Sequence, residues 1–366
     1  MRIVSVVGTR PQLIKAAALE PALRARFDTQ LIDTGQHYDD AMAGTFFREL
    51  GLRPPDHDLD VGGGSGSDQT GRMLIALDPI LSGAPPDAVL VYGDTNTTLA
   101  AALVAAKHGV PIAHVEAGLR SFDRRMPEEI NRVVADHLSR WLFAPTPAAV
   151  ANLRTEGIVD GVVQVGDVLQ DLVARMGSEV RDRAVLEGVG GGLLPGGYIL
   201  ATIHRAENRE RAAMEAWAAL LARIATADRP VVLALHPGTR AALDAAGIRL
   251  SRDVRVMEPQ GYRTTLGLQL HAAAVVTDSG GVQREAAWLH VPCLVLRGTT
   301  EWVEAVAGSG GSMVVVGLDA DRAQRELDRL APLDGSRADA ERRAADVRVE
   351  PAGAVDAIVD TLAGAG

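Results

Sequence analysis

Short apolar runs alternate with alanine-rich helical segments along the whole chain. The first run, Ile3–Val7, ends in the turn Gly8–Pro11, and a helical pattern begins at Leu13. A short apolar run, a helical segment and a second apolar run are typical of a β-α-β unit, whose two strands are parallel neighbours. The repeated pattern therefore predicts an α/β fold built on parallel sheets.

The expected strands fall into two sets, one on each side of the glycine-rich stretch Gly188–Gly197. The strands are expected at 3–7, 30–33, 88–92, 111–115, 141–144 and 162–165, then at 198–202, 231–235, 254–257, 274–277, 293–296 and 313–316. We expect two Rossmann-like, doubly wound domains that face a cleft. The first comprises residues 1–168, with a helix at 351–366 packed back onto it, and the second comprises residues 169–350. Leu169–Glu187 is expected to be helical and amphipathic, and Pro54–Ser67 is expected to be a loop.

Carboxylates follow two neighbouring strands of the first set. Asp94 comes just after 88–92 and Glu116 just after 111–115, and Glu128 and Glu129 open the next helix. In an open parallel sheet, ligands bind outside the carboxyl ends of the strands. The sequence therefore predicts a site that moves protons at this edge.

Two further strand ends in the first set carry polar side chains. Arg10 and Lys15 lie where the first helix begins, and a helix N-terminus with added positive charge is a candidate anion site. The alternative is an ordinary turn with solvated basic residues. Gln36 and His37 follow the second strand, where they suit a ligand edge or are simply exposed.

The segment Asp278–Glu285 is the clearest ligand motif in the second half. Gly280 and Gly281, between a strand and a helix, allow the backbone to approach a phosphate, and Ser279 adds a hydroxyl donor. Glu285, one turn into the helix, is positioned to accept hydrogen bonds from ribose hydroxyls. A plain tight turn with a surface glutamate is the alternative.

His204, Arg205 and His236 follow two strands that we expect to be neighbours. Their chemistry fits acid–base catalysis or diphosphate binding. Closely spaced metal ligands on one element are not found in the sequence, so no metal is expected. The sequence also lacks a G-x-S-x-G elbow and a G-x-G-x-x-G turn after the first strand, which argues against a serine hydrolase and a nicotinamide dehydrogenase.

The composition narrows the choice of partners and compartment. The chain has 366 residues with a net charge of −10, which disfavours a broad nucleic-acid surface. Its one cysteine, Cys293, cannot form a disulfide within the chain, and it reads as a small buried hydrophobe. No apolar run approaches the ~20 residues of a membrane span, and the N-terminus has no signal layout. We expect a cytoplasmic protein that binds neither nucleic acid nor a membrane.

Several of these segments together resemble one family, the non-hydrolysing UDP-N-acetylglucosamine 2-epimerases, from Ile3 to about Val306. The matching segments are Gly8–Pro11, Thr34–His37, Tyr92–Thr95, His114–Arg120, Pro127–Arg132, His204–Asn208 and Thr277–Glu285. The resemblance implies the two-domain glycosyltransferase-B arrangement and the interconversion of UDP-GlcNAc and UDP-ManNAc without an added cofactor. It also implies elimination of UDP to a 2-acetamidoglucal intermediate, followed by re-addition, and a homodimer.

By matching motif, the resemblance implies roles for individual residues. The implied catalytic residues are Asp94, Glu116, Glu128 and His204. The implied substrate-binding residues are Arg10, Lys15, Gln36, His37, Arg132, Arg205, His236, Ser279, Gly280, Gly281 and Glu285.

The chain departs from the family pattern at three places: Ala206 replaces a second arginine, Trp302-Val303 replaces Arg-Pro, and Asp39 replaces a glutamine of an activating site. The segments Arg125–Arg132, His236–Arg240 and Thr300–Glu304 are similar to a subgroup that includes 2-epimerases of UDP-2,3-diacetamido-2,3-dideoxyglucuronate, so the sugar stays open. The sequence is also compatible with a UDP-sugar glycosyltransferase, a hydrolysing epimerase, or a nucleotide-sugar binding protein without catalysis.

Overall fold

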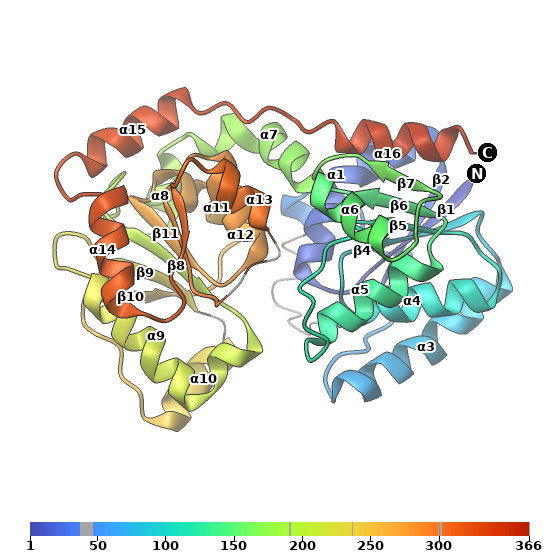
Figure 1. Cartoon of the computed structure of the whole chain (residues 1–366), viewed down its shortest axis with the longest axis horizontal. Coiled ribbons are helices and arrows are strands. Elements are labelled where there is room, and N and C mark those ends of the chain that lie inside the picture. The colour runs from blue at the N-terminus through green and yellow to red at the C-terminus, as the bar shows by residue number, and fades with distance from the viewer. Residues whose placement is uncertain (37–46, 190–191, 236, 299, 301, 366) are drawn as a thin grey trace. The chain divides into compact units, whose positions relative to one another are not determined.

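The computed structural model describes residues 1–36, 47–189, 192–235, 237–298, 300 and 302–365. They form two compact units: Met1–Leu172 with Glu350–Gly366, and Val173–Val349. Each unit contains a parallel sheet whose strands alternate with helices (Figure 1). The predicted α/β class with two doubly wound sheets is confirmed.

In its described residues, the first unit has a seven-stranded sheet of order β3-β2-β1-β4-β5-β6-β7. The strands are β1 (Arg2–Val7), β2 (Asp28–Asp33), β3 (His57–Asp58), β4 (Ala88–Tyr92), β5 (Ile112–Val115), β6 (Trp141–Ala144) and β7 (Val162–Gln164). The helices are α1 (Arg10–Arg26), α3 (Gly66–Gly83), α4 (Asn96–Lys107), α5 (Pro127–Leu138), α6 (Pro147–Thr155) and α16 (Ala354–Ala363), and α7 (Val168–Val180) continues into the second unit.

The second unit has a six-stranded sheet in its described residues, of order β10-β9-β8-β11-β12-β13. The strands are β8 (Ile199–Ile203), β9 (Val231–Leu235), β10 (Val254–Met257), β11 (Ala274–Thr277), β12 (Cys293–Val295) and β13 (Met313–Val315). The helices are α8 (Ala184–Val189), the 3-10 helix η1 (Ala206–Arg209), α9 (Arg211–Ile224), α10 (Pro237–Ala246), α11 (Tyr262–His271), α12 (Gly280–Trp288), α13 (Val303–Gly308), α14 (Ala320–Leu330) and α15 (Ser336–Asp346).

Strand order reverses once in each sheet. β1 pairs with both β2 and β4, and β8 pairs with both β9 and β11, so the chain leaves each central strand in one direction and returns on its other side. At such a switch point, the connections leave the carboxyl ends of the two central strands open. The segments after β1, β4, β8 and β11 are therefore the natural places for a site.

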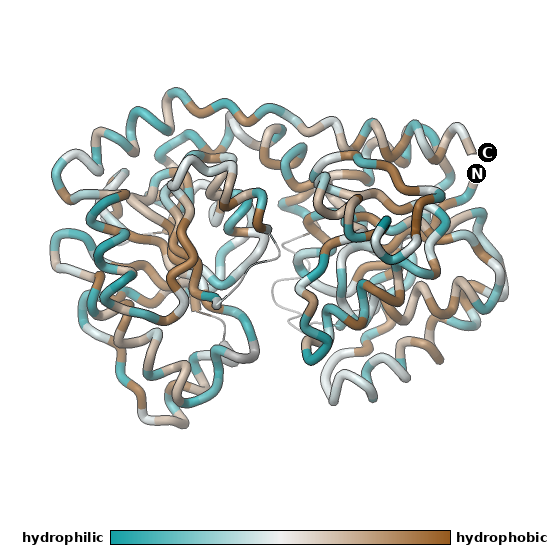
Figure 2. Tube along the Cα trace, in the orientation of Figure 1, coloured by the Kyte–Doolittle hydropathy of each residue, from teal (hydrophilic) through white to brown (hydrophobic). Residues whose placement is uncertain are grey.

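Aliphatic side chains fill both cores, as the low aromatic content requires. The strands carry much of the hydrophobic colour in Figure 2, and one core cluster surrounds β8 and β9 while another surrounds β1 and β4. Cys293 is fully buried in β12, and burial raises the pKa of its thiol to about 12. It is thus a small core residue, as predicted.

The segment 169–187 is helical as expected except at 181–183, where it divides into α7 and α8. Between the two helices, the Asp182 carboxylate accepts a hydrogen bond from Ala184 N, the first residue of α8, at 2.9 Å. The expected loop 54–67 was wrong in part. It contains β3, and its last residues begin α3, where Ser65 Oγ accepts from Asp68 N at 3.3 Å.

The C-terminal helix α16 belongs to the first unit. It lies against α1, and Arg26 forms an ion pair with Asp360 (Figure 1). The Asp171 carboxylate, on α7, accepts hydrogen bonds from Gly353 N at 3.0 Å and Val355 N at 2.9 Å. These bonds satisfy backbone donors at the start of α16, which would otherwise have no partner within the helix.

Gly8, after β1, allows two threonine side chains to approach the backbone. Thr34 Oγ1 and Thr97 Oγ1 lie 2.7 Å apart, and a Cβ added at Gly8 would overlap both. We expect Gly8→Ala to lower the free energy of unfolding by about 1–3 kcal/mol through overpacking. Gly71→Ala, inside α3 with nothing within 4 Å of the added Cβ, should instead raise it by about 0.5–1 kcal/mol. Urea unfolding of both variants measures the difference, and equal stabilities would contradict the packing argument.

Candidate functional site

Asp94 and Glu116 follow adjacent strands, as the sequence predicted. β4 and β5 pair in parallel with Tyr92 opposite Val115, so both carboxylates leave the sheet at the same edge. Glu116 has φ +75°, a conformation that few residues other than glycine adopt. Backbone strain of this kind persists where the surrounding structure holds it, and it is frequent at functional sites.

Lys15, on α1, forms an ion pair with Glu116, and both side chains are nearly buried. Gly93 makes room for this pair, since a Cβ there would lie 3.0 Å from Lys15 Nζ and the residue has φ +62°. The sequence predicted Lys15 as a ligand for an anionic substrate. The structure places its ammonium beside a predicted catalytic carboxylate.

Asp94 is held from α5. Arg132 forms ion pairs with Asp94 and, at 2.9 Å, with Glu129, while Asn131 Nδ2 donates to the Asp94 carbonyl oxygen at 2.9 Å. The side chain of Arg132 is 4% exposed and that of Asp94 is 34% exposed. Arg132 thus fixes a carboxylate that remains open to solvent.

The two glutamates at the start of α5 differ in environment. Glu129 is 2% exposed and accepts hydrogen bonds from Ser121 N at 2.8 Å, Ser121 Oγ at 2.9 Å and Phe122 N at 2.9 Å. It therefore holds the loop before α5. Glu128, the predicted catalytic residue, is half-buried.

Gln36 has a structural contact in the first unit. Its Oε1 accepts from Thr97 N at 3.0 Å and from Thr97 Oγ1 at 2.8 Å, so it anchors the first turn of α4. Arg10, the first residue of α1, is partly exposed at the end of β1. His37 lies outside the described residues.

In the second unit, the carboxylate of Asp278 organises the segment after β8. It is fully buried at the end of β11 and accepts from His204 N at 3.0 Å, Arg205 N at 3.0 Å and Asn208 Nδ2 at 2.6 Å. The side chain of His204 remains exposed. Asp278 was not predicted as a site residue, although its place after a strand next to β8 was a usable signal. His236 lies outside the described residues.

Ser279 is the N-cap residue of α12. Its Oγ accepts from Val282 N at 3.5 Å, and its own N donates to Thr277 Oγ1 at 3.0 Å. At Gly281 an added Cβ would meet only Ser279 Oγ, at 3.8 Å, so the backbone there is uncovered. With Gly280 as its first residue, α12 directs backbone N–H groups toward this space.

Glu285 is more enclosed than the predicted ribose contact requires. It is 4% exposed, and Gln269 Nε2 from α11 donates to its Oε2 at 2.5 Å. One residue earlier, the guanidinium of Arg284 stacks on the Trp302 ring at 3.7 Å from the ring centre. Trp302 is one of the departures from the family pattern, and its contact is with the helix that carries Glu285.

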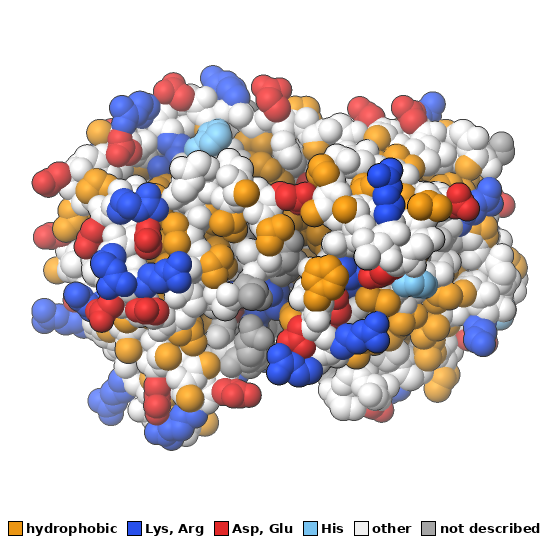
Figure 3. All heavy atoms as spheres, viewed as in Figure 1, with side chains coloured by type: hydrophobic (Ala, Val, Ile, Leu, Met, Phe, Trp, Pro, Cys, Tyr) orange, Lys and Arg blue, Asp and Glu red, His pale blue; other side chains and the backbone are white. Residues whose placement is uncertain are grey.

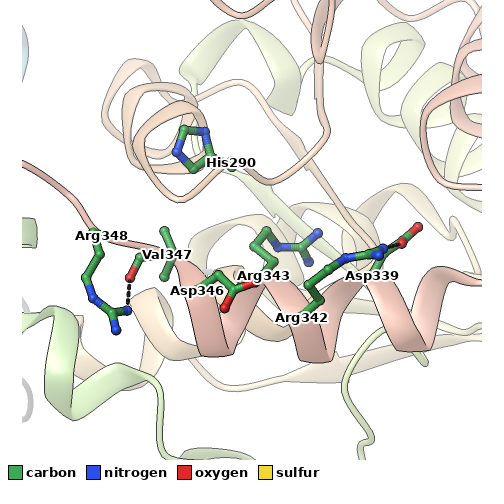
Figure 4. Close-up of a pocket in the computed structure, with 7 residues that line it drawn as sticks. All are labelled: His290, Asp339, Arg342, Arg343, Asp346, Val347 and Arg348. Atoms are coloured by element: carbon green, nitrogen blue, oxygen red, sulfur yellow. Dashed lines mark hydrogen bonds and ion pairs between the residues drawn. The ribbon is translucent and has the colours of Figure 1, made fainter.

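A groove of about 490 Å³ in the second unit contains none of the predicted site residues. Its lining residues are His290, Asp339, Arg342, Arg343, Asp346, Val347 and Arg348 (Figure 4). Arg343 donates to the Leu270 and Ala272 carbonyl oxygens, and Arg342 pairs with Asp339. These arginines are engaged in holding α15.

Among the described residues, no group of three or more His, Cys, Asp or Glu side chains could hold a metal ion. Within the same part of the chain, no helix is both long enough and apolar enough to cross a membrane. Acidic and basic side chains are interspersed on the face shown in Figure 3.

Comparison with known proteins identifies the family. The model of the family UDP-N-acetylglucosamine 2-epimerase matches residues 21–353. The chain belongs to this family. The recognition made from the sequence motifs is thereby confirmed.

The names of similar proteins in the epimerase family state different sugar substrates. UDP-2,3-diacetamido-2,3-dideoxy-D-glucuronate 2-epimerase of Pseudomonas aeruginosa is 43% identical over 331 residues, 88% of this chain and 90% of the relative. UDP-N-acetylglucosamine 2-epimerase of Methanocaldococcus jannaschii is 42% identical over 332 residues, 87% of this chain and 88% of the relative.

A solved epimerase structure is similar over the whole chain. The crystal structure of Methanocaldococcus jannaschii UDP-GlcNAc 2-epimerase in complex with UDP-GlcNAc and UDP has a TM-score of 0.87 and 36% identity, and the match covers 100% of both chains.

We expect Asp278→Asn to lower the free energy of unfolding by about 1–3 kcal/mol, because an amide NH₂ replaces an acceptor that faces several N–H donors. Glu258→Gln, at an exposed carboxylate paired with Arg240 at 3.1 Å, should change it by less than about 1 kcal/mol. Thermal unfolding monitored by circular dichroism compares the two variants. A loss no greater than that of Glu258→Gln would remove the organising role of Asp278.

Proposed function

We propose that this epimerase interconverts UDP-GlcNAc and UDP-ManNAc without an added cofactor. The observation that carries the proposal is the similarity, over the full length, to a structure bound to UDP-GlcNAc and UDP. The two carboxylates at the β4–β5 edge supply the acid–base groups that the chemistry needs.

The proposed reaction begins with removal of the proton at C2. The C2–H electrons form a double bond to C1, the C1–O bond breaks, and UDP leaves with that electron pair as 2-acetamidoglucal forms. A UDP oxygen then adds back to C1, and C2 takes a proton on its other face. The protein must therefore present proton-transfer groups to both faces of C2 and retain UDP between the two steps.

Four residues are proposed to carry the proton transfers and the departure of UDP. The proton transfers at C2 are assigned to Asp94, Glu116 and Glu128. His204 is proposed to interact with the leaving diphosphate or to act as an acid. The accessibility of Asp94 and His204, each fixed by buried partners, supports these roles. Interacting carboxylates titrate as a group, so the proposal does not assign which carboxylate removes the C2 proton in which direction of the reaction.

UDP is proposed to bind at the start of α12. The Ser279 cap, the uncovered backbone at Gly281 and the position of Gly280 as the first residue of the helix support a diphosphate there. Glu285 is proposed to bind the ribose. The further substrate contacts in this proposal are Arg10, Lys15, Gln36, His37, Arg132, Arg205 and His236.

A second candidate substrate is UDP-2,3-diacetamido-2,3-dideoxyglucuronate. It is favoured by the 43% identity to the Pseudomonas aeruginosa enzyme and by Trp302, which stacks on Arg284 where the family usually has Arg-Pro. A glycosyltransferase-like activity, or binding without turnover, would instead give no exchange at C2.

A cytoplasmic homodimer is part of the same proposal. The single cysteine, which is buried, supports a reducing compartment. Ile75 on α3 is 75% exposed and offers apolar surface to a second copy. Light scattering should give a mass of twice 38.5 kDa, and a mass of one chain would contradict the dimer.

Proton NMR of the purified protein with UDP-GlcNAc in D₂O tests the reaction. We expect deuterium at C2 of the sugar and signals of UDP-ManNAc, because deprotonation and reprotonation exchange that hydrogen with solvent. If UDP-GlcNAc remains intact without exchange, the same measurement with the diacetamido uronate decides between the second substrate and a protein without this activity.

Asp94→Asn should reduce kcat by about 10²–10⁴-fold, the usual contribution of a positioned acid or base. Binding of UDP should be retained, because the proposed UDP contacts are mainly in the second unit. Asp78→Asn, at an exposed carboxylate on α3, is the matched control. A fully active Asp94→Asn variant would refute the catalytic assignment.

Glu285→Ala should raise the Kd for UDP by about 10–100-fold, as expected for loss of hydrogen bonds to a charged group. Calorimetric titration with UDP measures this, with Glu258→Ala as the exposed control. Thermal unfolding is recorded in parallel because Gln269 loses a partner. Unchanged UDP affinity in a folded variant would remove the ribose assignment.

A further inference from the structure

A buried histidine connects the two turns that carry Asp94 and Glu116. His114, in β5, is fully buried. Its Nε2 lies 2.7 Å from the Gly93 carbonyl oxygen, and its Nδ1 lies 2.7 Å from Asp136 Oδ1. Each ring nitrogen therefore faces an oxygen atom that can accept a hydrogen bond.

The carboxylate of Asp136, on α5, continues the connection. Its Oδ2 accepts from Gly118 N at 3.1 Å and from Arg120 Nη1 at 2.7 Å. Arg120 also binds both carboxylate oxygens of Glu156, each at 2.7 Å. Burial acts to raise the pKa of Asp136, but His114 and Arg120 outweigh it and lower the pKa. His114, Asp136 and Arg120 thus form a buried hydrogen-bonded network, which Glu156 continues toward the surface.

The network contacts the Asp94 turn and the Glu116 turn on their buried side. Gly93 immediately precedes Asp94, and Gly118 lies two residues after Glu116. Gly93 has φ +62° and Gly118 has φ +81°, and a Cβ at Gly118 would overlap the Ala149 carbonyl group. His114 itself is two residues before Glu116, so one imidazole and one carboxylate bridge the ends of β4 and β5.

We propose that His114 and Asp136 are positioning residues for epimerisation, which fix the separation of the Asp94 and Glu116 turns. The inference rests on the proposed function. Neither residue touches the substrate in this proposal, and their effect passes through the Gly93 carbonyl group and the Gly118 amide. A displacement of about 1 Å in a reacting group costs about 100-fold in rate, so a loosened turn should slow the chemical step.

Two amide substitutions distinguish the hydrogen bond made by Nε2 of His114 from the one made by Nδ1. The side-chain NH₂ of His114→Gln reaches the place of Nε2 and can donate to the Gly93 carbonyl oxygen. That of His114→Asn reaches the place of Nδ1 and can bond only to Asp136. Both remove the same ring, so a merely structural role predicts equal losses of stability and activity.

We expect His114→Asn to lower kcat by about 100-fold, with KM and the Kd for UDP unchanged, whereas His114→Gln should retain most of the kcat. Thermal unfolding of the two variants should show similar losses. Asp136→Asn, which keeps the side-chain shape, is the second variant, and it should lower kcat without raising KM. It provides the test if His114→Asn does not fold.

The outcomes separate this inference from the proposed function. A parent protein with no C2 exchange on either UDP-sugar overturns both. A parent that exchanges C2, with folded His114→Gln and His114→Asn variants equally impaired, overturns the positioning role and leaves the epimerase assignment intact. An Asp136→Asn variant that keeps the parent kcat, or that changes only KM, overturns it as well.

Discussion

The reversal of strand order in each sheet is the constraint on which the position of the polar turns in each unit depends. Parallel strands need a crossover connection, and where two crossovers lead away from neighbouring strands their carboxyl ends stay uncovered. The reversal lies between β1 and β4 in the first unit and between β8 and β11 in the second. Most of the predicted site residues follow these strands or β5, which adjoins β4, whereas Gln36 and His37 follow β2 and His236 follows β9.

Buried carboxylates convert these strand ends into defined turns. Glu129, Asp136 and Asp278 are each almost completely inaccessible, and each accepts several hydrogen bonds from the chain around a more exposed side chain. Such groups are stable inside a protein only when their hydrogen bonds are satisfied. In each turn, the exposed side chain and the buried side chain that holds the turn therefore belong to different residues. Both kinds of residue are polar, and several of them are close to each other in sequence.

The sequence predicted the strands well because continuous apolar runs mark strands that are covered on both faces. It also predicted which carboxylates follow adjacent strands, as with Asp94 and Glu116. It did not reveal that Glu129 holds the loop before α5 or that Lys15 pairs with Glu116, because those contacts depend on how the chain folds around these side chains. The break at 181–183, after α7, was missed because these residues lie within an otherwise helical pattern.

The position of α16 has a consequence for the order of synthesis. This helix completes the first unit, yet the ribosome makes it only after the whole of the second unit has been translated. Nascent domains generally fold as units, from the N-terminal side first. Here the second unit can fold while the first still lacks the helix that covers α1. The buried Ile358 and Leu362 would then be the last core residues to dock.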